Sequence, residues 1–267
     1  MRIIAAVLLI AFCPAVFGFD FLKPALNQPE LDGDKYYSLS VSVNEPDAAL
    51  AYIEKAIKAY ETIIAKGKIR PSMLVKYVNA RDFKLRYFVL KPSSRRIAYE
   101  NLIIRFEPLG KRLSATKEYN YVMALLWGRR GEITQDTMED GNKNIAEKIK
   151  FYGEALYHID KGYQGSFSRK ILGRVHYLTP NIPFVLGWPD KNKSKMYLKE
   201  FLKANPGNTE GKMYLADTLW ALGDVKAAEK LYMEVVKSKP RKGNMLYDAM
   251  AIKTCMARMK KLNISTK

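Results

Sequence analysis

Cysteine and histidine are scarce in this sequence, with two of each among 267 residues. His158 and His176 lie far apart, and neither has a second ligand at the spacing of a zinc site, so we interpret both as helix-edge residues. The glycine-rich loop of nucleotide-binding proteins and the glycine-flanked serine of a nucleophile elbow are also missing. These absences predict a non-catalytic protein without a bound metal or cofactor.

Long apolar runs are missing too, except for one near the start. Arg2, the apolar run from Ile3 to Phe12 and the small residues ending at Gly18 are typical of a secretory signal peptide. The run is shorter than the roughly 20 residues of a membrane-spanning helix, which disfavours an uncleaved anchor. We therefore expect residues 1–18 to be removed after about Gly18 and the protein to be exported to the periplasm.

Cleavage would leave Cys255 as the single thiol of the mature chain. An intramolecular disulfide is then excluded, even in an oxidising compartment. Cys255 falls within a predicted helix, where a buried and inert thiol is favoured. Stability must therefore come from packing.

Negative charge is in short supply, with 27 Asp and Glu against 45 Lys and Arg and a formal net charge of +18. In a cytosolic protein this excess would indicate nucleic acid. An exported chain meets anionic polymers, lipid head groups and acidic proteins instead, so we expect no nucleic-acid partner. The lysines are scattered, and solvation of helix surfaces is the favoured interpretation of most of them.

Helical periodicity begins at residue 46. Residues 19–45 hold Pro24, Pro29 and Gly33 without that periodicity, and we predict an irregular lead-in there. Pro46 suits a helix start, and apolar residues then recur at helical spacing until Gly67. Further helices are predicted at 73–90, 94–113, 117–130, 142–161, 166–178, 194–204, 209–222, 225–238 and 246–262. Pro108 should kink or split one of them. Residues 46–267 thus predict an all-α fold of antiparallel helix pairs, stacked as a solenoid or bundle.

Residues 209–242 resemble one tetratricopeptide repeat. The residues at that family's signature spacings are Leu215, Ala216, Leu219, Gly223, Ala228, Tyr232, Val235 and Pro240. The two alanines would let paired helices approach closely, while Gly223 would permit the turn between them. Part of the pattern recurs 34 residues earlier, in a partial repeat at 175–208. A looser third copy surrounds Ala124, Trp127 and Gly131.

The chain as a whole is similar to the exported repeat proteins that accompany TRAP-type tripartite transporters, including the stretch from Leu172 to Arg174 before a proline-rich loop. This resemblance implies a non-catalytic adaptor with a central pore or groove, which partners a periplasmic solute-binding protein. Related exported repeat proteins are linked to lipid or sterol carriage. The alternative function is therefore a carrier that encloses an apolar small molecule. The sequence leaves open whether the chain forms a homo-oligomer.

In tetratricopeptide pairs the first helix usually lines the concave face. The outward positions predicted to bind a partner or ligand are Glu210, Met213, Asp217 and Trp220, with Glu118 and Tyr121 in the looser copy. Trp220 is either a binding anchor or packs beneath the C-terminal helix.

The segment 179–190 has three prolines and large apolar residues where the repeat predicts a helix. This loop either plugs the core, which we favour, or forms a binding lip through Phe184 and Trp188. If it contacts a ligand, the fluorescence of Trp188 should respond to that ligand.

Overall fold

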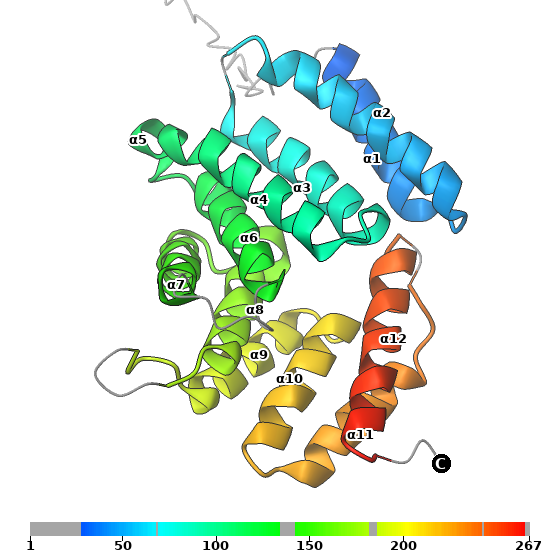
Figure 1. The fold of residues 1–267 in the computed structure, drawn as a ribbon, viewed down its shortest axis with the longest axis vertical. Coiled ribbons are helices and arrows are strands. Elements are labelled where there is room, and N and C mark those ends of the chain that lie inside the picture. The colour runs from blue at the N-terminus through cyan, green and yellow to red at the C-terminus, as the bar shows by residue number, and fades with distance from the viewer. Residues whose placement is uncertain (1–27, 68, 134–141, 182–185, 242, 265–267) are drawn as a thin grey trace, which may run out of the picture.

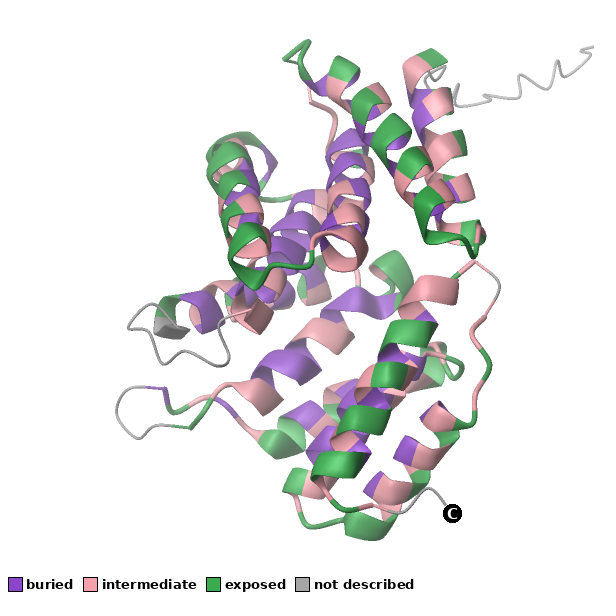
Figure 2. Ribbon diagram, turned by 45° about the vertical axis from the view of Figure 1, so that its right-hand side comes forward, coloured by how far each residue is buried: buried purple, intermediate pink, exposed green. Residues whose placement is uncertain are grey.

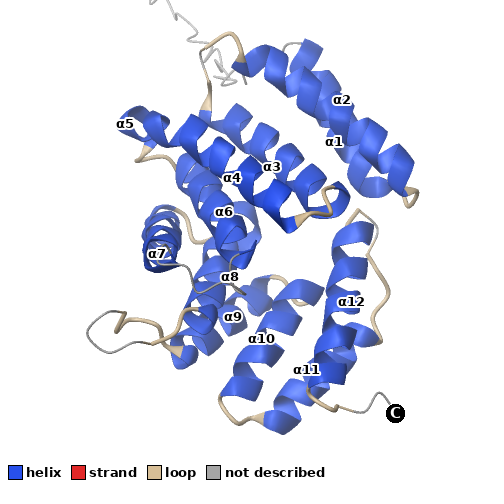
Figure 3. Ribbon diagram, viewed as in Figure 1, coloured by secondary structure: helices blue, strands red, loops and turns tan. Residues whose placement is uncertain are grey.

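The computed structural model describes residues 28–67, 69–133, 142–181, 186–241 and 243–264. Within these ranges every regular element is a helix, and none is a strand (Figure 3). The predicted all-α fold of adjacent helix pairs is confirmed.

The helices form a curved array (Figure 1). In chain order they are α1 Gln28–Ser42, α2 Pro46–Ile64, α3 Pro71–Phe88, α4 Pro92–Phe106, the 3₁₀ turn η1 Glu107–Leu109, α5 Gly110–Leu113, α6 Lys117–Ile133, α7 Asn142–Ile159, α8 Tyr163–Leu178, α9 Lys191–Ala204, α10 Thr209–Ala221, α11 Val225–Val236 and α12 Met245–Lys261. Neighbours pack as the pairs α1 and α2, α6 and α7, α8 and α9, and α10 and α11. The curve brings α12 back against the N-terminal helices, where Tyr247 packs on Phe83 of α3 at 5.8 Å between ring centroids. None of the described helices is long and apolar enough to cross a membrane.

Helix α1 corrects the predicted irregular lead-in, which is wrong for residues 28–42. The buried side of this helix is polar or small, because it presents Glu30, Gly33 and Ser40 to the neighbouring helices. Lys76 of α3 donates to the Glu30 carboxylate at 3.0 Å, and Arg70 also pairs with it. At Gly33 the helix lies so close to the ring of Tyr60 that an added Cβ would collide with it. Tyr37 and Val41 also pack against the core, but such apolar contacts are few, so hydrophobic periodicity gives little sign of a helix that charge pairing and close approach largely hold.

Proline marks most of the helix boundaries in the N-terminal half. Pro46, Pro71 and Pro92 each occupy the first turn of a helix, where the missing N–H is not needed. Pro108 ends α4 and leaves a 3₁₀ turn and a short helix behind it, so the predicted split is confirmed. The backbone at residues 164–166 is left-handed, which breaks the first turn of α8.

Buried residues concentrate on the helices inside the curve, and exposed residues follow its outer surface (Figure 2). One large apolar cluster joins α2, α3, α4 and α6 and extends to α7 and α8, and a second joins α9, α10, α11 and α12. The first cluster thus belongs to the N-terminal part of the array and the second to its C-terminal part. Ion pairs of Glu210 in α10 with Arg86 in α3 and Lys170 in α8 connect the two parts.

In the best repeat, residues 209–242, small residues lie where α10 and α11 pack closely against each other. Ala216 of α10 and Ala228 of α11 are both fully buried in one cluster with Tyr232 and Val235. Gly223 has a φ of +82° in the turn between the two helices, a conformation that side chains disfavour. The repeat thus closes through small side chains and one left-handed turn.

Replacing Ala228 with leucine should lower the free energy of unfolding by about 1–3 kcal/mol, because added methylenes have no space at this crossing. Urea denaturation of the variant would measure the loss. Ala221→Leu is the matched control, since Ala221 is exposed at the end of the partner helix. Equal stability of the two variants would contradict the close approach of α10 and α11.

Candidate functional site

The inner face of the array is closed by ion pairs that meet on α10. Glu210 accepts from Arg86 Nη2 of α3 at 3.1 Å and from Lys170 Nζ of α8 at 2.9 Å. Tyr214 Oη, one turn further along α10, donates to the same carboxylate at 3.0 Å. Arg86 and Glu210 are 124 residues apart in the sequence, so this carboxylate joins the two ends of the curve.

Asp217, two turns along α10 from Glu210, links α10 to α8, α11 and α12. Its carboxylate accepts from Arg174 Nη1 of α8 at 3.0 Å and from Arg258 Nη1 of α12 at 2.5 Å. Tyr232 Oη of α11 donates to the other oxygen at 2.8 Å. Asp217 is only 5% exposed. A buried carboxylate with three donors is satisfied, and it acts as a cross-link between the last repeat and its neighbours.

A third set of charges completes the network between α3 and α6. Arg129 Nε donates to Asp82 at 2.9 Å, and its Nη1 donates to Glu132 at 2.9 Å. Asp82 also accepts from Tyr99 Oη of α4 at 2.8 Å. The side chains that these contacts connect along the inside of the curve are called the inner network: Asp82, Arg86, Tyr99, Arg129, Glu132, Lys170, Arg174, Glu210, Tyr214, Asp217, Tyr232 and Arg258.

The electrostatics of the inner network favour the ionised form of Glu210. Burial alone would raise the pKa of the Glu210 carboxyl, but Lys170 and the nearby arginines outweigh it and hold that pKa well below its usual value. Between α6, α8 and α10 lies a cavity of about 20 Å³, lined in part by Arg129, Lys170 and Glu210. That space suits about one water molecule.

The structure places the predicted site residues differently from the expected exposed surface. Met213 and Asp217 are buried, so the prediction that they point outward is wrong. Glu210 is only partly accessible, because Arg86 and Lys170 cover it. Trp220 is partly buried and packs against the cluster shared by α10, α11 and α12. The expected concave face is therefore already occupied by the chain itself at these positions, while a role in partner binding stays a prediction.

In the looser third copy of the repeat, Glu118 and Tyr121 differ in exposure and do not form one surface. Tyr121 is buried, and its hydroxyl donates to Asn79 Oδ1 of α3 at 2.8 Å. The ring of Tyr121 packs edge-on against Phe167 of α8 at 4.8 Å between centroids. Its predicted outward position is wrong, because α3 and α8 both cover it. Glu118 is half-buried at the start of α6.

Sequence reasoning missed the cations of the inner network. Arg86, Arg129 and Lys170 come from helices outside the best repeat, and no spacing rule pairs them with Glu210. Arg174 lies in the stretch from Leu172 to Arg174 that supported the family resemblance, yet its contact with Asp217 depends on the stacking of α8 on α10. The only available signal was a charged residue on an otherwise apolar helix face.

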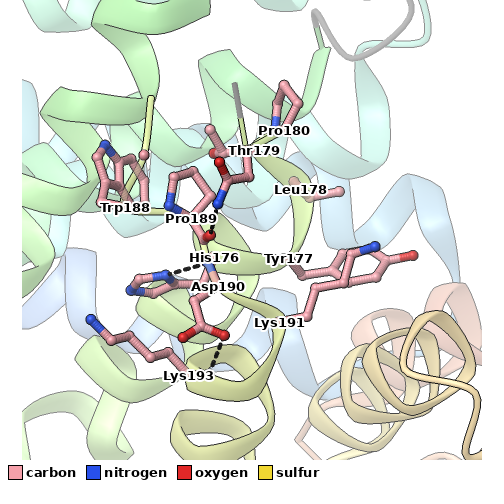
Figure 4. A pocket seen from close by; sticks show the side chains of 12 residues that line it. His176, Tyr177, Leu178, Thr179, Pro180, Trp188, Pro189, Asp190, Lys191 and Lys193 are labelled. Carbon is pink, nitrogen blue, oxygen red and sulfur yellow. Dashed lines mark hydrogen bonds between the residues drawn. The ribbon is translucent and has the colours of Figure 1, made fainter. Parts of the chain in front are cut away.

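Part of the loop after α8 packs on the core. Trp188 Nε1 donates to Glu147 Oε1 of α7 at 2.8 Å, and the ring packs against the cluster of Ile145, Ile149 and Val175. Figure 4 shows Trp188 beside His176 and Asp190. Trp188 thus covers core between α7 and α8, which agrees with a plug. Phe184 lies outside the described residues, and the binding-lip interpretation stays a prediction.

A hollow of about 730 Å³ lies beside this loop, lined by residues that include Tyr177, Thr179, Asn181 and Lys191 (Figure 4). Residues 182–185, which follow Asn181 in the sequence, are outside the described ranges. The extent of the hollow therefore supports no site.

The two histidines differ in environment. His158 is exposed, but His176 is buried, so its predicted helix-edge position is wrong. The backbone N–H of Asp190 donates to His176 Nδ1 at 3.2 Å. Burial, with a contribution from Lys193, lowers the pKa of His176 to about 4, so the ring is a neutral acceptor that anchors the loop. Among the described residues no three His, Cys, Asp or Glu side chains form a group that could hold a metal.

Cys255 is fully buried, as predicted, and burial raises the pKa of its thiol to about 11. In a chain that begins at residue 19, where it is the single cysteine, it should not react with a thiol reagent at about pH 8 until the protein unfolds. Met256→Cys is the matched control, because Met256 is 47% exposed on the same helix and should react in the folded protein. Fast labelling of native Cys255 would show that the packing of α12 does not bury this thiol.

Comparison with known proteins finds a match to a repeat family over part of the chain. Residues 214–242 match the model of the tetratricopeptide repeat, which covers most of α10 and all of α11. A search of curated proteins finds no match to the chain. The tetratricopeptide repeat is a protein-interaction module, and such repeats typically act as scaffolds without catalysis. The match falls on the repeat that the sequence pattern predicted.

Proposed function

We propose that this protein is an exported, non-catalytic adaptor of tetratricopeptide type, which binds a protein partner in the cell envelope. The observation that carries the proposal is the matched repeat at the end of a stacked array of helix pairs. Arrays of this kind present extended surfaces to other proteins. The signal-peptide pattern at residues 1–18 supports export, and the solute-binding component of a tripartite transporter is the partner class that the family resemblance suggests.

The inner network limits where such a partner binds. Glu210 and Asp217 already have cationic partners within the chain, and a second protein would have to replace them. Such an exchange would strand buried charges, which is costly. The partner surface of this adaptor therefore lies on the outer or terminal helices.

The inner cavity gives no support to the alternative function of an apolar carrier. It has about 20 Å³, whereas sites for small molecules usually have hundreds of cubic ångströms. No described feature favours the carrier over the adaptor.

Affinity capture from an envelope extract under mild conditions would test the adaptor. The proposal expects one protein to be retained in stoichiometric amount by the chain from residue 19 onward. Absence of any stoichiometric protein would contradict it. Export is tested separately by cell fractionation and N-terminal sequencing, which should give a mature chain starting at Phe19. Retention of residues 1–18 on the protein would contradict cleavage.

A further inference from the structure

Helix α12 occupies the place of the first helix in a repeat that follows α10 and α11. A shift of 34 residues, the length of one repeat, carries Gly211 in α10 onto Met245 at the start of α12. The pattern of buried residues in the two helices agrees with this register on the side that faces the preceding repeat. Tyr214 and Asp217 are buried there in α10, and the corresponding Asp248 and Ala251 are buried in α12.

The other side of α12 differs in burial from the corresponding side of α10. In α10 this side carries Leu215, Ala216 and Leu219, all buried in the cluster that α11 covers. The corresponding residues in α12 are Ala249, Met250 and Lys253, and all three are exposed. One turn further on, Met256 is 47% exposed. Within the described part of the chain no second helix covers this row, which we call the open row: Ala249, Met250, Lys253, Met256 and Lys260.

The charge of the open row indicates which kind of partner it would bind. Lys253, Lys260 and the adjacent Lys261 are exposed and form no ion pair with any described residue. The single acid of α12, Asp248, is turned inward and held by Arg241 and Thr209. A second copy of the chain on this row would place lysine against lysine, which disfavours a symmetric dimer. An acidic helix would instead pair its carboxylates with these lysines.

We propose that the open row binds an amphipathic helix of a partner protein, with small and apolar residues on one side and carboxylates at its flanks. This proposal rests on the adaptor function above and adds the surface and the chemistry of the partner. The bound helix would take the place of the second helix of a repeat, as α11 does on α10. Met250 and Met256 suit this role because flexible thioether side chains adapt to the helix that covers them.

A peptide based on α11 provides a direct probe. It has the sequence of residues 224–238 with Lys226→Glu, Lys230→Glu and Lys237→Glu, because α11 covers the equivalent row of α10. Fluorescence anisotropy should show saturable binding to the full chain, weaker at higher salt. The same peptide with its native lysines should bind at least about tenfold more weakly.

Protein variants assign the binding to α12. Met250→Glu should weaken binding of the acidic peptide by about tenfold or more, and so, separately, should Lys253→Glu combined with Lys260→Glu. Met196→Glu is the matched control, since Met196 is 45% exposed on α9 and lies outside the open row. Circular dichroism would verify that every variant keeps its helices. No saturable binding, or equal loss in the control, would overturn the proposal.

Two further outcomes separate this surface from the adaptor function. If the unmodified chain captures an envelope protein and Met250→Glu captures it equally well, the open row is not the docking surface, although the adaptor function stands. If the unmodified chain captures nothing, the adaptor function fails, and binding of the peptide then tests the surface by itself. A dimer in sedimentation velocity that Met250→Glu dissociates would overturn the proposal in favour of a second copy.

Discussion

Replacing Asp217 with alanine should lower the free energy of unfolding by about 3–5 kcal/mol, because two arginines and a tyrosine lose the carboxylate that they share. The largest part of this loss comes from Arg174, since it is 8% exposed and would keep its charge without a carboxylate partner. The loss is greater than the net value of the ion pairs, because it includes the cost of a buried charge left unpaired. Removing Asp217 therefore weakens the junction of α8, α10, α11 and α12.

Urea denaturation followed by circular dichroism would measure this loss. Glu54→Ala is the matched control, because the Glu54 carboxylate pairs with Lys84 at 2.6 Å with about half of its side chain exposed. An exposed pair of this kind contributes less than about 1 kcal/mol. If Asp217→Ala costs no more than the control, Asp217 is not a buried cross-link between these helices.

Replacing Glu210 with glutamine should both destabilise the protein at neutral pH, by about 3 kcal/mol, and reduce its sensitivity to acid. Lys170 and Arg86 hold the pKa of this carboxyl well below its usual value against the effect of burial. A carboxyl whose folded pKa is depressed stabilises the folded state above its unfolded pKa of about 4.3. That stabilisation is lost as the pH falls through the folded pKa.

The measurement compares unfolding free energies of the wild type and Glu210→Gln between about pH 7 and pH 3. The difference between them should shrink as the pH falls, because the wild type alone loses the Glu210 contribution. Glu229→Gln serves as the control, since Glu229 makes no ion pair among the described residues. A difference that stays constant with pH would mean that Glu210 is not held ionised by its neighbours.

The sequence predicted the parts of the fold that depend on local rules. Pro108 lacks the N–H that a continuing helix needs and Gly223 readily takes a positive φ, and the structure has a break and a turn at these residues. The small residues Ala216 and Ala228 identified the close helix crossing. These features depend on steric properties of single residues, so a pattern in one sequence is enough to find them.

The remaining features depend on residues that are distant in the sequence. Helix α1 was missed because Glu30 pairs with Arg70 and Lys76 of another element, which no periodicity shows. The outward position of Asp217 was wrong for the same reason, since Arg174 and Arg258 reach it only after the helices stack. Charged residues on an inner helix look like a binding surface until their partners within the chain are known.

A double-mutant cycle between Arg86 and Glu210 tests the closed inner face most directly, because their ion pair joins α3 to α10 across the curve. Unfolding free energies of Arg86→Met, Glu210→Gln and the double variant give the coupling between the two side chains. The closed face predicts a coupling of at least about 1 kcal/mol. A coupling of zero within error would mean that the two helices do not meet, and the inner face would then be open to a partner.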